Sequence, residues 1–172
     1  MTVAILNNVP ETIVRHADNY STQHTTMKKY LFFSVFIAFV LISCSNDIVY
    51  TEYRTLPLSG WDADSVLIFE VPITDTVNSY DIIVDIRHST VYPYQNMWLF
   101  VNTDTIDFYL ANQRGEWLGN GSGELREMPV LYKSDIRFDS AGTYNFSIIQ
   151  AMRDKSLKGV RDVGLIVKRH KH

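Results

Sequence analysis

Cys44 is the residue whose type and position point most directly to chemistry, and it is the only cysteine among 172 residues. It ends the segment Leu41-Ile42-Ser43-Cys44, in which an apolar residue stands three places before the cysteine and a small residue directly before it. Such a lipobox lets a peptidase cut before the cysteine, whose thiol then carries a diacylglycerol. We therefore predict lipidation of Cys44, which leaves no disulfide, thiolate nucleophile or cysteine-ligated metal in the mature protein.

The segment before this cysteine predicts export. Lys28 and Lys29 precede an uncharged, mostly apolar run over residues 30–42. A bilayer core needs about 20 apolar residues, so this run is too short to cross it and has the length of a signal-peptide h-region. We interpret residues 27–43 as a lipoprotein signal peptide; the alternative is a transmembrane anchor with an incidental cysteine. Residues 1–26 are polar and irregular, and are interpreted as an upstream start artefact or a long n-region.

Few other residues combine into a chemical site. The sequence has no His-Glu-x-x-His, P-loop or Gly-x-Ser-x-Gly motif. The Gly-rich run 119–123 opens no predicted helix, so a turn is favoured over a phosphate site. His88 stands alone beyond a predicted strand and is expected at the surface. Asp62 and Asp64 are expected in a turn, with a calcium loop as the alternative. We therefore expect no enzyme activity, no cofactor and no metal.

The elements that position these residues are predicted to be strands. Apolar and polar residues alternate with a period of two, as in half-buried strands, over residues 80–87, 106–110, 144–149 and 163–168. Denser apolar runs at 66–71 and 97–101 suit strands that are buried on both faces or central in a sheet. Because turn residues separate the runs, the predicted fold class is all-β, an antiparallel β-sandwich of Ig-like or jelly-roll-like type. Residues 149–157 are the one short helix expected.

Length and charge constrain the organisation and the partners. The chain suffices for one domain, with residues 44–57 as a lipidated leader and residues 58–170 as the β-sandwich. Residues 49–56 of the leader could already add an edge strand. The formal net charge is −3, from 16 basic and 19 acidic side chains. Phosphate binding needs a basic patch, and only residues 168–171 are rich in base, so we expect no nucleic-acid partner.

Aromatic residues near turns are candidates for stacking a sugar or for gripping a protein partner. These candidates are Trp61, Tyr92, Tyr94 and Trp117. Core packing is nevertheless the favoured interpretation for the aromatic residues, because Trp98, close to Tyr92 and Tyr94, lies inside an apolar strand.

A series of short motifs follows the lipobox in a fixed order. They are residues 92–101 (Tyr-Pro-Tyr-Gln-Asn-Met-Trp-Leu-Phe-Val), 104–106 (Asp-Thr-Ile), 110–111 (Leu-Ala), 115–121 (Gly-Glu-Trp-Leu-Gly-Asn-Gly), 142–146 (Gly-Thr-Tyr-Asn-Phe), 150–153 (Gln-Ala-Met-Arg) and 162–165 (Asp-Val-Gly-Leu). The set resembles the GldH family of gliding-motility lipoproteins over nearly the whole mature chain. The resemblance implies an envelope lipoprotein needed for gliding, with no assigned catalytic residues to carry over.

The function implied by the resemblance is a non-catalytic accessory of gliding motility and of the associated secretion and adhesin-moving machinery. Its expected partners are the membrane, through lipid on Cys44, and other envelope proteins. The alternative is a surface glycan-binding or nutrient-capture lipoprotein. The expected location is the outer membrane. Surface-exposed lipoproteins of this bacterial group often have an acidic run after the cysteine, and the single acid Asp47 therefore favours the periplasmic face.

Asp-Ser and Asp-Thr pairs followed by a small or aliphatic residue recur along the chain. They are similar to the O-glycosylation acceptor motif of exported proteins in the same bacterial group. The candidate acceptors are Ser65, Thr76, Thr105 and Ser140. The alternative is that these pairs only form turns, since Asp, Ser and Thr side chains readily bond the backbone in turns.

Overall fold

The structure is a computed structural model that describes residues 47–171. The signal peptide 27–43, Cys44 and the upstream residues 1–26 lie outside the described residues. Ten strands make up the described part, and no helix occurs in it. The strands are β1 (Ile48–Thr55), β2 (Trp61–Asp62), β3 (Leu67–Ile73), β4 (Tyr80–Ser89), β5 (Asn96–Val101), β6 (Asp104–Tyr109), β7 (Leu125–Ile136), β8 (Gly142–Gln150), β9 (Ser156–Leu157) and β10 (Val160–Arg169).

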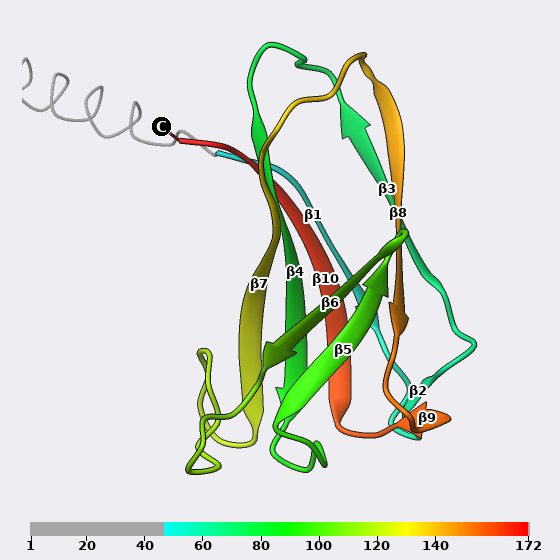
Figure 1. Ribbon diagram of the computed structural model, residues 1–172, viewed down its shortest axis with the longest axis vertical. Coiled ribbons are helices and arrows are strands. Elements are labelled where there is room, and N and C mark those ends of the chain that lie inside the picture. Colours follow the sequence, from blue (N-terminus) through cyan, green and yellow to red (C-terminus); the bar gives the residue numbers. More distant parts are fainter. Residues whose placement is uncertain (1–46, 172) are drawn as a thin grey trace, which may run out of the picture. The chain divides into compact units, whose positions relative to one another are not determined.

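Two four-stranded antiparallel sheets face each other across the core (Figure 1). We call the sheet with strand order β1-β10-β4-β7 sheet A and the sheet with order β3-β8-β5-β6 sheet C. The short strands β2 and β9 form a separate ribbon. Eight strands that alternate in this way between two sheets form a jelly roll. The all-β prediction is therefore confirmed, and of its two types the jelly-roll-like one is observed.

The strand pairs are nested like the two arms of one folded hairpin. β1 pairs with β10, β2 with β9, β3 with β8, β4 with β7, and β5 with β6. The tip is the turn between Val101 and Asp104, where Asn102 has a φ of 53°. Asn102 Oδ1 accepts a hydrogen bond of 2.8 Å from the backbone N–H of Ser147, which fastens the tip to β8.

The alternating pattern of the sequence places one side of each strand in the core. In β4, Tyr80, Ile82, Val84 and Ile86 are each no more than 1 % exposed, as their period predicts. In β5, Met97, Leu99 and Val101 are buried, but Trp98 and Phe100 point outward with 42 % and 45 % exposed. Neither dense apolar run is buried on both faces. The run at 66–71 lies mostly in the edge strand β3, but the run at 97–101 forms β5, which is central in its sheet as the alternative predicted. The expectation of a core position for Trp98 was wrong.

The helix expected at residues 149–157 is absent. β8 continues to Gln150 because Leu99, Phe100 and Val101 of β5 pair with its last three residues. The buried Gln150 side chain then holds the following turn: its Oε1 accepts from the N–H of Met152, and its Nε2 donates to the carbonyl of Asp154. These bonds replace the local hydrogen bonds of a helix, so a loop leads into β9.

The leader proves to contain a complete strand. β1 occupies Ile48–Thr55 and pairs with β10 from Ile48↔Lys168 to Thr55↔Asp162, which makes it an edge strand of sheet A. The expected edge strand is therefore confirmed. No helix in residues 47–171 combines the length and the hydropathy needed to cross a membrane.

Two glycines of positive φ test how closely the loops pack. A Cβ on Gly159 (φ +87°) would lie 2.6 Å from Tyr92 Cα, whereas one on Gly123 (φ +64°) meets nothing within 4 Å. Both alanine substitutions incur the strain of a left-handed backbone, about 1–2 kcal/mol, and Gly159→Ala adds a backbone clash. We expect Gly159→Ala to lower the free energy of unfolding by about 2 kcal/mol more than Gly123→Ala, measured by urea unfolding of the full-length protein. Equal losses would mean that the Tyr92 loop moves freely.

Candidate functional site

Two of the four candidate aromatic contacts belong to the core. Trp61 and Tyr92 are 1 % and 3 % exposed. Their polar atoms are satisfied internally, since Trp61 Nε1 donates to the carbonyl of Ser65 at 3.3 Å and the Tyr92 hydroxyl donates to the carbonyl of Asn96 at 2.9 Å. Neither ring is therefore available to stack a sugar or to contact a partner.

The other two candidates, Tyr94 and Trp117, are half-buried, and each packs edge-on against the ring of Tyr92. The Tyr94 hydroxyl donates to Asp154 Oδ1 at 2.9 Å, which fixes its ring beside the loop after β8. Trp117 packs edge-on against the imidazole of His88, with ring centroids 4.8 Å apart. Tyr94 thus keeps an accessible face, and Trp117 mainly covers a buried histidine.

His88 lies in the core and not at the surface, which corrects the sequence prediction. It is fully buried between Tyr92 and Trp117, on the inward side of β4. Its Nδ1 lies 3.2 Å from the carbonyl of Ser89, and its Nε2 has no hydrogen-bond partner among the described residues. Burial lowers the pKa of His88, so the ring is neutral at physiological pH. Aromatic packing is its evident role.

The outer face of sheet C carries apolar side chains that the sequence prediction missed. Ile68 on β3, Phe100 and Trp98 on β5 are 51 %, 45 % and 42 % exposed. Phe100 stands beside the half-buried Ile149 of β8 in the sheet register. The unbroken apolar run 97–101 concealed their phase, because no polar residue within it marks the outward side of the strand.

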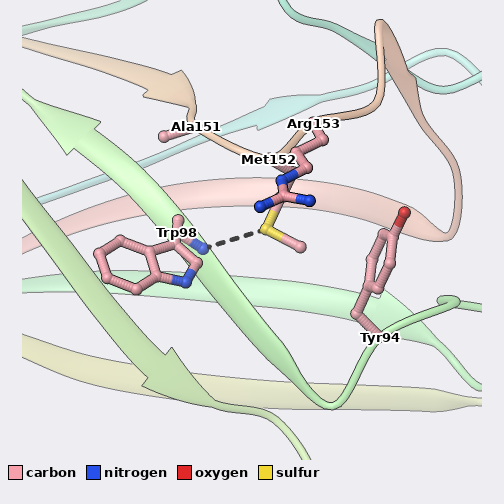
Figure 2. A pocket seen from close by; sticks show the side chains of 5 residues that line it. All are labelled: Tyr94, Trp98, Ala151, Met152 and Arg153. Carbon is pink, nitrogen blue, oxygen red and sulfur yellow. Dashed lines mark hydrogen bonds between the residues drawn. The ribbon is translucent and has the colours of Figure 1, made fainter.

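A pocket opens at one end of this outer face, where β5 and the loop after β8 separate. Its volume is about 470 Å³, and it is lined by Tyr94, Trp98, Ala151, Met152 and Arg153. Figure 2 shows Trp98 and Tyr94 on opposite sides, with Met152 and Arg153 between them. The backbone N–H of Trp98 reaches only the sulfur of Met152, at 3.3 Å. Thioether sulfur is a weak acceptor, so this donor remains available to a stronger acceptor.

The outer face of sheet A is different, because it buries a carboxyl group. Asp85 on β4 is 1 % exposed and accepts a 2.6 Å hydrogen bond from the hydroxyl of Tyr53 on β1. The Tyr53 ring lies over Gly164, where a Cβ would meet the ring at 2.5 Å. Arg87 stacks on the other side of that ring, 4.1 Å from its centroid, and pairs with Glu127 at 3.5 Å.

Proton affinity at Asp85 follows from this packing. Burial raises the pKa of Asp85 to about 6; the bond from Tyr53 lowers it, and the adjacent Glu127 carboxyl raises it further. No described donor reaches Asp85 Oδ1, and a bond between it and Glu127 requires a shared proton. The pair could exchange a proton with solvent, but it lies outside the pocket of sheet C, and no nucleophile is placed beside it.

A second polar cluster contains the residue types of a serine-hydrolase triad without its geometry. His170 Nδ1 lies 2.7 Å from Asp81 Oδ1, and Ser134 Oγ donates to the same oxygen at 2.7 Å. In a catalytic triad the serine and the acid contact opposite ring nitrogens, whereas here Ser134 lies 3.4 Å from the same Nδ1. The cluster ties β4, β7 and the chain end together. Burial would raise the pKa of Asp81, but the bonds from Ser134 and His170 and the Asp135 N–H lower it.

Comparison with known proteins decides the family. The family model described as GldH lipoprotein matches residues 48–167. The chain belongs to the GldH lipoprotein family. The match begins at the first residue of β1 and ends within β10, so it spans the whole nested hairpin of the GldH fold described above.

Two relatives with the GldH name cover most of this chain. The gliding motility lipoprotein GldH of Flavobacterium johnsoniae is 33 % identical over 143 residues, 74 % of this chain and 88 % of the relative. The GldH homolog of Christiangramia forsetii is 32 % identical over 155 residues, 81 % of this chain and 94 % of the relative. No solved structure matches the chain. Membership makes this chain a lipid-anchored protein of the cell envelope, from a family named for gliding motility.

The structure gives the exposure of the candidate glycosylation residues and the local role of the acidic pair Asp62 and Asp64. Thr76, Thr105 and Ser140 are exposed and Ser65 is half-buried, so modification of these residues stays a prediction. Asp62 caps a turn, with its Oδ1 accepting the N–H of Asp64 at 2.9 Å. Within residues 47–171 no group of three potential metal ligands converges.

Burial of the Asp85 carboxyl on sheet A predicts that the free energy of unfolding depends on pH. The folded state holds the Asp85 proton up to about pH 6, while the unfolded chain releases it near its ordinary pKa of about 4. Stability therefore falls as pH rises from about 4 through 6, and the full cost remains above that range. Asp85→Asn keeps an acceptor for Tyr53 and removes the ionisation.

We expect Asp85→Asn to raise the free energy of unfolding by about 1–3 kcal/mol at pH 7.5, from the size of the shift. The gain should vanish near pH 4, as followed by urea unfolding at several pH values. Asp107→Asn, at an exposed acid of sheet C, is the matched control and should show no such pH trend. A gain for Asp85→Asn that is equal at pH 4 and pH 7.5 would contradict the assignment.

Proposed function

We propose that this protein is a non-catalytic accessory of the gliding machinery and of the secretion apparatus that delivers and moves surface adhesins. Two observations support the proposal: the chain belongs to the GldH lipoprotein family, and the printed name of its relative in Flavobacterium johnsoniae is gliding motility lipoprotein. The polar clusters around Asp81 and Asp85 hold strands together without the geometry of an enzyme site. The protein would act by binding other envelope proteins.

The anchor is proposed to be lipid on Cys44. Only Ser45, Asn46 and Asp47 separate this cysteine from the first residue of β1. An extended chain spans at most about 3.6 Å per residue, so the start of β1 would lie within about 15 Å of the lipid. The outer membrane and its periplasmic face are the proposed location, because Asp47 is the single acid close to the cysteine.

The observation that carries the proposed partner binding is the exposed apolar face of sheet C. Ile68 on β3 and Phe100 and Trp98 on β5 are each about half-exposed on one face of the sheet, with β8 and its half-buried Ile149 between the two strands. Aromatic side chains are enriched at the centre of protein interfaces, where truncating one of them often costs more than 2 kcal/mol. The outer face of sheet A instead carries the Tyr53–Arg87–Glu127 cluster, which separates its exposed side chains Leu125 and Leu131 from each other.

Replacement of Cys44 tests the anchor. Cys44→Ser removes the acyl acceptor and should abolish incorporation of a clickable palmitate analogue into the protein in cells. The same change should shift the protein from the membrane fraction to the soluble fraction or retain it as an uncleaved precursor. Ser45→Ala is the control next to the site and should be acylated normally. Undiminished labelling of Cys44→Ser would show that another residue carries the lipid.

Introduction of a charge into the apolar face tests partner binding. Phe100→Arg places a cation at the centre of the face and should reduce recovery of crosslinked motility and secretion proteins at least tenfold, as identified by mass spectrometry after pull-down from whole cells. Leu131→Arg makes the same change at a 57 % exposed leucine on the outer face of sheet A and should leave recovery unchanged.

Both positions point to solvent, so both variants should keep cooperative unfolding. The proposal fails if the unaltered protein recovers only bulk envelope proteins, or if Leu131→Arg disrupts recovery as strongly as Phe100→Arg does.

Glycan binding is the second candidate function, and the pocket at Tyr94 and Trp98 is the observation that favours it.

A further inference from the structure

The pocket beside β5 is built on a braced loop. Gln150, 2 % exposed, bonds both the N–H of Met152 at 2.8 Å and the carbonyl of Asp154 at 2.7 Å. Asp154 in turn accepts from the Tyr94 hydroxyl, and the N–H of Ala63 donates to the carbonyl of Lys155 at 2.8 Å. These bonds hold the two aromatic walls and the loop in place before any ligand arrives, which limits the entropy lost on binding.

Two polar groups of the pocket, the Arg153 guanidinium and the backbone N–H of Trp98, are donors. Arg153 is exposed and forms no ion pair with any residue of the described chain. The backbone N–H of Trp98 meets only the Met152 sulfur. The carboxylate of Asp154 is engaged by Tyr94 and is not among the lining residues, and neither is Asp107, the cross-strand neighbour of Trp98. These two donors are complementary to a group that only accepts, such as a carboxylate.

The apolar part of the pocket lining could accommodate a sugar ring. Trp98 is 42 % exposed, and Met152 lies between it and Tyr94 (Figure 2). The volume of about 470 Å³ lies within the usual range of about 300–1,000 Å³ for small-molecule sites. A pyranose ring presents an apolar face of C–H groups that fits against an indole, and in a uronic acid the carboxylate projects from the rim of the same ring.

We propose that this pocket binds an acidic sugar unit of a polysaccharide, which stacks on Trp98 and pairs its carboxylate with Arg153. Met152 moves aside as its sulfur yields the Trp98 N–H to a ligand oxygen. Binding of an acidic sugar deepens the glycan-binding candidate named above. The site shares Trp98 with the proposed partner-binding face but requires neither Phe100 nor Ile68, so Arg153→Gln and Phe100→Arg test the two proposals separately. It also differs from the four sequence candidates, of which only Tyr94 belongs to it.

The test uses the full-length protein in detergent micelles with trigalacturonate as the probe. Its methyl ester is the matched ligand, since it keeps the sugar rings and removes the charges. Binding is followed by calorimetry and by tryptophan fluorescence. Trp98 is the most exposed of the three tryptophans among the described residues, so its emission should respond most to a bound ligand. We expect trigalacturonate to bind at least tenfold more tightly than its ester, since charged hydrogen bonds are worth about this factor.

Two substitutions separate the two parts of the site. Arg153→Gln should weaken trigalacturonate at least tenfold and leave the ester unchanged, whereas Trp98→Ala should weaken both and abolish the fluorescence change. Lys155→Gln removes a neighbouring exposed cation that does not line the pocket and should alter neither ligand.

Three results would overturn the proposal. One is that neither saccharide binds at a concentration of about 10 mM, because even a weak site with a dissociation constant of about 1 mM would be nearly saturated there. Another is equal binding of the acid and its ester. The third is tighter, Arg153-dependent binding of triglutamate, which would identify the site as one for an acidic peptide. None of these results bears on gliding or on partner recovery, which the Phe100→Arg experiment tests separately.

Discussion

Nested antiparallel pairing is the constraint on which this structure depends. Each strand finds its partner at the mirror position about the turn at Asn102, so the first strand pairs with the last and the contacts become longer in range from the tip outward. Loop closure makes long-range pairs slow to form, and sheet A cannot be completed until β10 has been synthesised. Because β10 lies between β1 and β4, loss of the C-terminal strand would remove a central member of the sheet and would leave β1 without a neighbour.

The outer faces of the two sheets differ in which side chains they expose to solvent. Sheet A covers its outer face locally: Tyr53 lies over Gly164 and Asp85, and Arg87 lies over Tyr53, so a buried carboxyl is shielded at the cost of a raised pKa. Sheet C leaves Ile68, Trp98 and Phe100 in contact with solvent. Exposed apolar patches often mark interaction sites, and this exposure is the basis on which partner binding is proposed for sheet C.

The fold could be predicted from the sequence because alternation is a local signal. Tyr80 to Ile86 and Val163 to Val167 have the period of half-buried strands, and both lie in the core as expected. Where apolar residues are continuous, as in Met97–Val101, the period disappears, and the outward position of Trp98 and Phe100 follows only from the pairing of β5 with β6 and β8. Periodicity cannot supply that information.

The candidate sites were less predictable than the fold, because they depend on residues distant in sequence. Asp85 is buried by Tyr53, 32 positions away, and His88 by Trp117. Gln150 converts a helical pattern into a loop through bonds from its buried side chain. The lipobox is different, because its four residues are contiguous and need no fold to be recognised.

The position of β1 has a mechanical consequence. Its N-terminal end is the point at which the chain leaves towards the proposed anchor, and its register with β10 runs from Ile48↔Lys168 to Thr55↔Asp162. The end is reinforced where the Arg169 N–H donates to the Asp47 carbonyl and Lys171 pairs with the Asp47 carboxylate. A pull on the anchor directed along β1 would load these hydrogen bonds in shear, all at once, and not peel them apart singly. Shear loading of several hydrogen bonds at once means that tension on this end of the chain would not readily detach the first strand.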